Sequence, residues 1–434
     1  MVPMVGGAYG SPPRCTATGS RRLSTRAGRP DPGSWEAPAV SPGDDDARSV
    51  AGRGRLGGRS LAPVAGTFAA FGLFMGAWTV ATPEVERALG GGPARLGLVM
   101  SAALVVASGV NTVGGTLAER RGTTAALRGA LVAWAVALGV GAVLPAPWGV
   151  AAGIVVVLSL GGAVDVIANV AATAGLADRP GHLVRLHAVF NLGGAAGTVV
   201  VGVLLAVAGA AGWRWAWVVV AVLVVGVVVV TAGVHLPAGG AGSAVRFSDG
   251  MRELRSQRLV PVAVALALAA VVEGGVNTWG VLQLRGQLDA GLLVGAGGAF
   301  VGYLVAVTAR LSVSRVETAA AARRAVIGGT VLAAVGLVVL ATVSQTIVAA
   351  AGLVLAAGGV SVCWPLLMSE VGRGRERPGV LVGAVTTFGY LGSVIGPGLV
   401  GAVSGAIGVP AGLLVLAGAA IAVAALVGAR RGMR

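Results

Sequence analysis

The stretch from Ser159 to Gly197, SLGGAVDVIANVAATAGLADRPGHLVRLHAVFNLGGAAG, contains two apolar segments joined by a short charged turn. In the first segment Asp165 and Asn169 are four residues apart, and His187 and Asn191 repeat this spacing in the second. Residues at this spacing share one face of an α-helix. Because an Asp at mid-bilayer costs about 3 kcal/mol on insertion scales, we expect these faces to point into a cavity or toward a partner. The stretch therefore predicts two membrane helices whose polar faces line a solute pathway.

The composition of the whole chain predicts the same environment. Hydrophobic residues make up 56% and charged residues only 11%, whereas soluble domains carry about 25% charged residues. Apolar runs of bilayer-spanning length recur from Leu61 to the C-terminus. We therefore predict an all-α polytopic membrane protein with twelve transmembrane helices, at about residues 61–82, 95–118, 124–144, 149–171, 185–209, 214–236, 259–283, 291–310, 325–343, 347–369, 378–401 and 406–428.

Two polar stretches define the predicted domain organisation. Residues 1–60 are rich in Pro, Gly, Ser and Arg without apolar periodicity, so we expect a disordered cytoplasmic tail. Residues 237–258 form the longest polar break after the first span. They predict a cytoplasmic linker between two six-helix bundles, at residues 61–236 and 259–434.

The distribution of arginine predicts the orientation. All 32 basic residues are arginines. With the N-terminus inside, nineteen arginines outside the tail lie in cytoplasmic segments and four lie on the opposite side. This bias predicts a cell-membrane protein with both termini in the cytoplasm. The net charge of +15 then favours the lipid bilayer as partner, and no basic patch with aromatic readers suggests nucleic acid.

Few residues suggest enzymatic chemistry. Cys15 and Cys363 are far apart, the three histidines do not cluster, and there is no CxxC, HExxH or Walker motif. We expect no catalytic site, no metal, no cofactor and no ATP-driven step, and we expect a monomer.

One loop carries a family resemblance. The sequence Gly115-Thr-Leu-Ala-Glu119-Arg120-Arg121-Gly122 lies between the second and third spans. It resembles the signature loop of the major facilitator superfamily, G-x-L-[AS]-[DE]-R-x-G. The resemblance implies a fold of two six-helix bundles and a cytoplasmic gate, with Arg310 in a weaker repeat of the loop. The alternative is a positively charged membrane anchor without a gating role.

Further stretches resemble the fucose-permease-like branch of that superfamily. They are the stretch quoted first, Trp78-Thr-Val-Ala-Thr-Pro83, Glu273-Gly-Gly-Val-Asn277-Thr-Trp279, and Phe388-Gly-Tyr390-Leu-Gly392 followed by Gly396-Pro397. The resemblance implies that the polar and aromatic side chains of these stretches face a solute, and the candidates are Trp78, Asn169, Asn191, Asn277 and Trp279. Interhelical hydrogen bonding is the alternative role for the asparagines.

The chain also departs from that branch. Ala81 and Asn277 stand where the branch has Arg and Asp, and Glu84 is expected in water beyond the outer end of the first span. Asp165 and Glu273 remain as intramembrane acids and as candidates for proton coupling, because a buried carboxylate that meets each side of the membrane in turn can carry a proton. The alternative is that each acid is only structural.

These observations predict a secondary active transporter that moves a small solute together with protons by alternating access, with a sugar-like solute as the candidate. Export of a drug or secondary metabolite is the alternative within transport. The antiporter signature of the superfamily includes a Gly-Pro step on the fifth helix. The corresponding stretch here, Gly193 to Gly197, has no proline, which argues mildly against export. A transporter-like receptor is the alternative from another class.

Overall fold

A computed structural model describes residues 56, 58–176, 180–237, 247–313, 315–316, 318–372 and 378–429. Every regular element in these ranges is a helix. The predicted disordered tail lies outside the described residues, except for Leu56 and the short helix η1 (Gly58–Ser60). Leu56 is buried, and its backbone N–H donates to the Gly175 carbonyl at 3.0 Å. The described fold therefore begins a few residues before the predicted first span.

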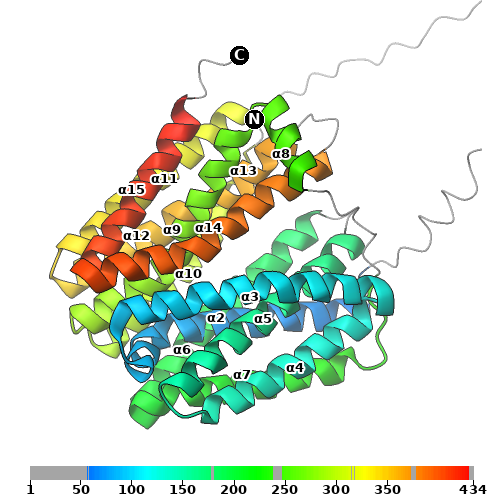
Figure 1. The fold of residues 1–434 in the computed structure, drawn as a ribbon, viewed down its shortest axis with the longest axis horizontal. Helices are drawn as coiled ribbons and strands as arrows, with labels where there is room; N and C mark the ends of the chain where they lie inside the picture. The colour runs from blue at the N-terminus through cyan, green and yellow to red at the C-terminus, as the bar shows by residue number, and fades with distance from the viewer. Residues whose placement is uncertain are drawn as a thin grey trace, which may run out of the picture. The chain divides into compact units, whose positions relative to one another are not determined.

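The first half of the chain forms six long helices, coloured blue to green in Figure 1. They are α2 (Leu61–Leu89), α3 (Gly92–Arg121), α4 (Thr123–Val143), α5 (Trp148–Gly175), α6 (Pro180–Ala208) and α7 (Gly212–Thr231). Within this group α2 packs against α5, α6 and α7, and α4 packs against α5 and α7. A 3₁₀ turn, η2 (Gly209–Ala211), separates α6 from α7.

The second half forms a corresponding group, coloured green to red in Figure 1. Its elements are α9 (Val260–Val281), a π-helical turn η3 (Leu282–Gln287), α10 (Leu292–Val313), α11 (Ala319–Thr342), α12 (Thr346–Ser361), α13 (Cys363–Gly372), α14 (Pro378–Ile407) and α15 (Val409–Ala429). A short amphipathic helix, α8 (Phe247–Ser256), lies in the predicted linker and packs against α14. The two groups meet where α3 packs on α14, α6 on α10 and α2 on α9.

The prediction of twelve spans is confirmed for the described residues. Length and hydropathy alone give eleven candidate spans, because Arg185–Thr231 is taken as one stretch of 47 residues. The 3₁₀ turn η2 divides that stretch into α6 and α7, which brings the number to twelve. The tenth span is itself broken into α12 and α13 at Val362.

Glycine allows α2 and α6 to pack with their backbones in contact. A Cβ atom at Gly72 would lie 1.9 Å from the Phe190 carbonyl oxygen, and one at Gly76 would lie 1.9 Å from the Gly194 oxygen. Small residues four apart are the usual means of such close approach in membranes. This contact fixes the height of Asn191 on α6 against the middle of α2.

Side chains from other helices bond backbone groups close to two prolines. Pro365 has no N–H to donate to the Ser361 carbonyl one turn earlier, and the chain breaks there between α12 and α13. Next to Pro397, the backbone of α14 is bridged by a side chain from α3. The Ser101 hydroxyl donates to the Val394 carbonyl at 2.7 Å and accepts from the Gly398 N–H at 2.8 Å. Ser101 is thereby inserted into the hydrogen-bond ladder of a helix in the other group.

Candidate functional site

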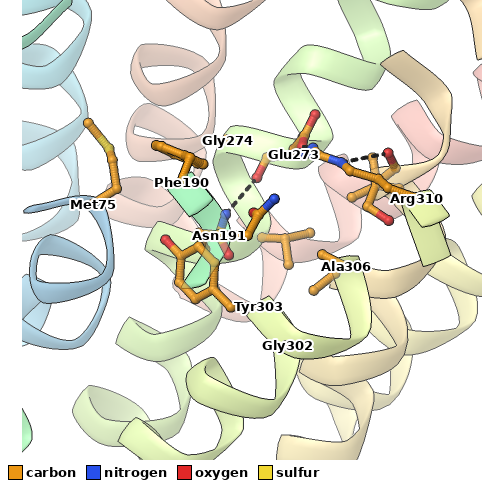
Figure 2. A pocket seen from close by; sticks show the side chains of 14 residues that line it. Met75, Phe190, Asn191, Glu273, Gly274, Gly302, Tyr303, Ala306 and Arg310 are labelled. Carbon is orange, nitrogen blue, oxygen red and sulfur yellow. Dashed lines mark hydrogen bonds and ion pairs between the residues drawn. The ribbon is translucent and has the colours of Figure 1, made fainter. Parts of the chain in front are cut away.

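A cavity of about 190 Å³ lies where α2 and α6 of the first group face α9, α10 and α12 of the second. Figure 2 shows Asn191, Tyr303 and the Glu273–Arg310 pair around this space, with Met75 and Phe190 closing one side. Its lining residues are Met75, Phe190, Asn191, Glu273, Gly274, Val276, Asn277, Gly302, Tyr303, Ala306, Arg310, Ala357, Val360 and Ser361.

The charged part of this cavity is a single ion pair. The guanidinium of Arg310 on α10 donates from Nη2 to Oε1 of Glu273 on α9. Its Nε donates to the Ser361 carbonyl at 3.2 Å, the oxygen that Pro365 leaves without an intrahelical donor. The side chains are 29% exposed for Arg310 and 31% for Glu273. The pair is thus anchored on one side and open to the cavity.

Two predicted asparagines line the cavity from opposite groups. Asn191 donates from Nδ2 to the His187 carbonyl at 3.0 Å, and Asn277 donates to the Glu273 carbonyl at 3.5 Å. Each amide is held by the carbonyl one turn earlier on its own helix. This local bond holds each amide in place beside the cavity.

A second cavity of about 220 Å³ adjoins the first and shares Met75, Gly274, Asn277 and Tyr303 with it. Its lining is mostly apolar and includes Trp78, another predicted candidate. The two cavities together form a compartment with one ionic end and one aromatic end.

Tyr303 is the lining residue that sequence reasoning missed. Its ring packs over Gly194 of α6, where a Cβ atom would come within 2.6 Å of it. Its hydroxyl lies 3.4 Å from Thr79 Oγ1 on α2, and Tyr303 itself is buried. A tyrosine within an apolar run gives no spacing signal, but a polar aromatic on a small-residue helix could have been noted.

Other predicted candidates lie elsewhere. Asp165 and Asn169 line neither of the two cavities, and Asn169 Nδ2 donates to Asp165 Oδ1 at 3.0 Å. Trp279 is fully buried in the packing of α9 and lines neither cavity. The structure thus brings Glu273 together with Asn191 and Asn277, but it does not bring Asp165 to the same cavities.

The predicted gate loop lies at the junction of α3 and α4. Arg120 and Arg121 end α3 and are exposed, and Gly122 has a φ of 85°, a conformation that favours glycine. The Glu119 side chain and the surroundings of Gly115 lie outside the described part of the structure. Arg310 was predicted in the weaker repeat of this loop in the second half of the chain. It lies near the end of α10, and its side chain lines the first cavity.

The expectation for Glu84 is wrong. It is only 5% exposed, because α2 continues to Leu89 and Arg285 of η3 covers the carboxylate. Arg285 donates to Glu84 at 2.7 and 2.9 Å and to the Val80 carbonyl at 2.6 Å. The first helix therefore has a buried acid after all, and this acid forms an ion pair between the two groups.

The fold and the cavity together define a class of protein. Twelve membrane helices in two groups of six, with a partly polar cavity where the groups meet, are the architecture of a solute transporter of the secondary type. In the described ranges no group of three His, Cys, Asp or Glu side chains is placed to bind a metal.

The comparisons with known proteins give the family. The model of the Major Facilitator Superfamily matches residues 64–397, so the chain belongs to this superfamily. A search of curated protein sequences finds no match.

Solved structures agree in fold at low sequence identity. The nucleoside transporter NupG is 14% identical with a TM-score of 0.69, and the match covers 87% of this chain and 100% of that one. The fucose:proton symporter FucP of E. coli is 15% identical with a TM-score of 0.58, covering 85% and 98%. The xylose transporter XylE of E. coli is 17% identical with a TM-score of 0.62, covering 85% and 95%.

Proposed function

We propose that the chain is a secondary active transporter that moves a small polar solute by alternating access and couples this movement to protons. The observation that carries the proposal is the cavity between the two groups, with an ion pair and two amides in its wall. Asn191 comes from one group and Asn277 from the other. A solute bound to both would therefore sense the relative movement of the groups.

Glu273 is the carboxylate that we assign to proton coupling. It lines the cavity and is about one-third exposed, so water can deliver a proton to it. Asp165 remains a second candidate, but its carboxylate is held by Asn169 on the same helix and lines neither cavity.

We further propose that the end of the two groups where α2 meets α3, which contacts between the groups hold closed, faces away from the cytoplasm. With the N-terminus inside, α2 ends and α3 begins on the outer side, in accord with the arginine bias. The Glu84–Arg285 pair and the Ser101 bridge to α14 both lie toward this end. Opening to the outside would require both contacts to break. A tag on the N-terminus that is accessible in intact cells would overturn this orientation.

Flux measurements test the proposal directly. Purified protein in proteoliposomes with an imposed proton gradient should accelerate uptake of at least one labelled solute from a panel of nucleosides, fucose, xylose and small organic acids. The panel follows what the structural neighbours are named for and adds the acids for the cavity's cation. Equal uptake by protein-containing and empty vesicles for every solute would reject the transport function.

Export of an apolar drug or metabolite is the second candidate. The mostly apolar wall of the second cavity, with Trp78, Met100 and Leu104, favours it. Vesicles loaded with hydrophobic dyes would distinguish export, since only an exporter would lower the dye content when the gradient is applied.

A further inference from the structure

We propose that the transported solute is a small organic anion, of the carboxylate or sulfonate type, which binds Arg310 in place of Glu273 when Glu273 takes up a proton. This inference rests on the proposed function and names the substrate class of the same cavity. It also gives a reason for coupling the solute to a proton.

The charge of the cavity wall is the first step. Of the residues that line the two cavities, only Glu273 and Arg310 carry a charge. Arginine stays protonated at every physiological pH, whereas a carboxylate can be neutralised. The wall is therefore neutral while Glu273 is ionised and carries one positive charge when Glu273 is protonated. A partly buried cation without a partner is costly, so the protonated state favours an anion.

The anchoring of Arg310 is the second step. Its Nε is held by the Ser361 carbonyl at 3.2 Å, independently of Glu273. When the Glu273 carboxyl turns neutral, the proton resides on that carboxyl group and the ionic bond to Nη2 is lost, while the guanidinium keeps its backbone contact. The N–H groups of Arg310 that no longer bond Glu273 can then donate to two oxygens of one carboxylate or sulfonate.

The neighbouring cavity accounts for the rest of the solute. Trp78, Met75 and Tyr303 supply an aromatic and apolar wall next to the ion pair. The two cavities together enclose about 400 Å³, which is in the range of sites for small molecules. An anionic head at Arg310 and a compact body of one ring fit this arrangement.

Other titratable groups lie on the elements that pack against the pair. Helices α12 and α15 contribute none within their described residues. Glu84 on α2 is bound to Arg285, and His187 on α6 is close enough to Arg310 for an electrostatic interaction. Among the side chains that the structure describes, the remaining ones on elements packed against the pair are Glu86, Arg87, Arg185, Tyr303, Cys363, Glu370 and Tyr390. Protonation of His187 would also add positive charge, so the test must separate His187 from Glu273.

Proton and anion binding then reinforce each other. Proton binding to Glu273 and anion binding to Arg310 both require that the Glu273–Arg310 ion pair is broken. Each binding event therefore promotes the other. By linkage, protonation of Glu273 raises the affinity for the anion by the same factor as the bound anion raises the affinity of Glu273 for the proton.

Binding of benzenesulfonate to the purified protein tests the inference. This probe keeps its charge between about pH 5 and about pH 8, so any pH dependence comes from the protein. Isothermal titration in lipid nanodiscs should show tighter binding at the acidic end, and the neutral isostere benzenesulfonamide should bind weakly without pH dependence. Sulfonate binding that is absent, or equal at both ends, would overturn the inference.

Two variants and a control assign the effect to the pair. Glu273→Gln mimics the protonated acid and should bind the sulfonate at both pH values as tightly as the unmodified protein does at the acidic end. Arg310→Gln should weaken binding roughly 10- to 100-fold, because a charged hydrogen-bond donor is lost. Arg255→Gln, which removes an exposed arginine on α8, should change nothing. Persisting pH dependence in Glu273→Gln would assign it to His187 and overturn the role of Glu273.

The flux assay separates this inference from the proposed function. Gradient-driven uptake of a neutral sugar or nucleoside, with no uptake of the sulfonate or of small carboxylates, would refute the anion class and leave transport intact. Failure of every solute would reject the transport function itself.

Discussion

Two ion pairs of this transporter, Glu84–Arg285 and Glu273–Arg310, have the same chemistry but different surroundings. Glu84 and Arg285 join the first group to the second, with side chains only 4% and 12% exposed. Glu273 and Arg310 both belong to the second group and are about one-third exposed at the cavity. The first pair can change only if the groups move, whereas the second can exchange a partner with solvent while the groups stay in place. We infer that the first pair controls conformation and the second recognises ligand.

Breaking the inter-group pair should have the largest effect. In Arg285→Gln the Glu84 carboxylate keeps only Arg87, whose side chain is 63% exposed. Removal of one partner of a buried pair costs about 3–5 kcal/mol. We expect this cost to fall on the closed arrangement, so that spin labels at Gly90 and Leu293, on opposite groups, report a longer distance by pulsed electron resonance.

Two further variants control this experiment. Glu84→Gln combined with Arg285→Gln removes both charges and should recover most of the closed population, since no unpaired charge remains. Arg87→Gln changes an exposed partner and should cost less than about 1 kcal/mol. An unchanged label distance in Arg285→Gln would show that this pair does not hold the groups together.

Neutralising the cavity acid should change coupling and leave the fold intact. In Glu273→Gln we expect solute exchange to continue while the proton gradient no longer drives accumulation, because the proton-binding carboxylate is gone. Asp165→Asn is the matched control, since Asp165 is also an intramembrane acid but lines neither cavity. Gradient-driven uptake that is lost in Asp165→Asn and kept in Glu273→Gln would transfer the coupling role to Asp165.

Restoring the backbone N–H at position 365 should have a smaller effect, on the affinity of the Glu273–Arg310 site for the anion. Pro365→Ala supplies the N–H that can bond the Ser361 carbonyl, which then competes with Arg310 Nε. The net value of such a hydrogen bond is about 0.5–1.5 kcal/mol. We expect benzenesulfonate affinity to fall roughly 2- to 10-fold, with an unfolding temperature that is unchanged or higher. Pro410→Ala, at the start of α15 away from the cavity, should not change the affinity.

Local patterns in the sequence predicted much of this architecture. Apolar runs predicted the twelve spans, and the i, i+4 spacing predicted that Glu273 and Asn277 share one helix face; both residues line the first cavity. Such inferences succeed because helix periodicity and bilayer thickness act on neighbouring residues.

Contacts between distant residues could not be predicted in this way. Glu84 was expected in water because it lies beyond the predicted end of the first span, and its partner Arg285 lies 201 residues later in the chain, where local patterns do not reveal it. Arg310 was assigned to the gate because its stretch resembles a weaker repeat of the signature loop, and no local pattern shows that it pairs with Glu273. Trp279 and Trp78 are both tryptophans of a predicted polar stretch, but only packing decides that the first is buried in the core and the second faces a cavity.

The smallest effect on the arrangement of the two groups is expected from their uncharged contact beside the cavity, between Thr79 and Tyr303. Tyr303→Phe removes only the 3.4 Å contact with Thr79, because the ring against Gly194 is kept. A long hydrogen bond between neutral groups contributes less than about 1 kcal/mol. We expect the label distance between the groups to stay as in the unmodified protein and the affinity for solute to change less than about fivefold. A shift as large as that of Arg285→Gln would mean that the hydroxyl contact, rather than the ion pair, decides which arrangement the groups adopt.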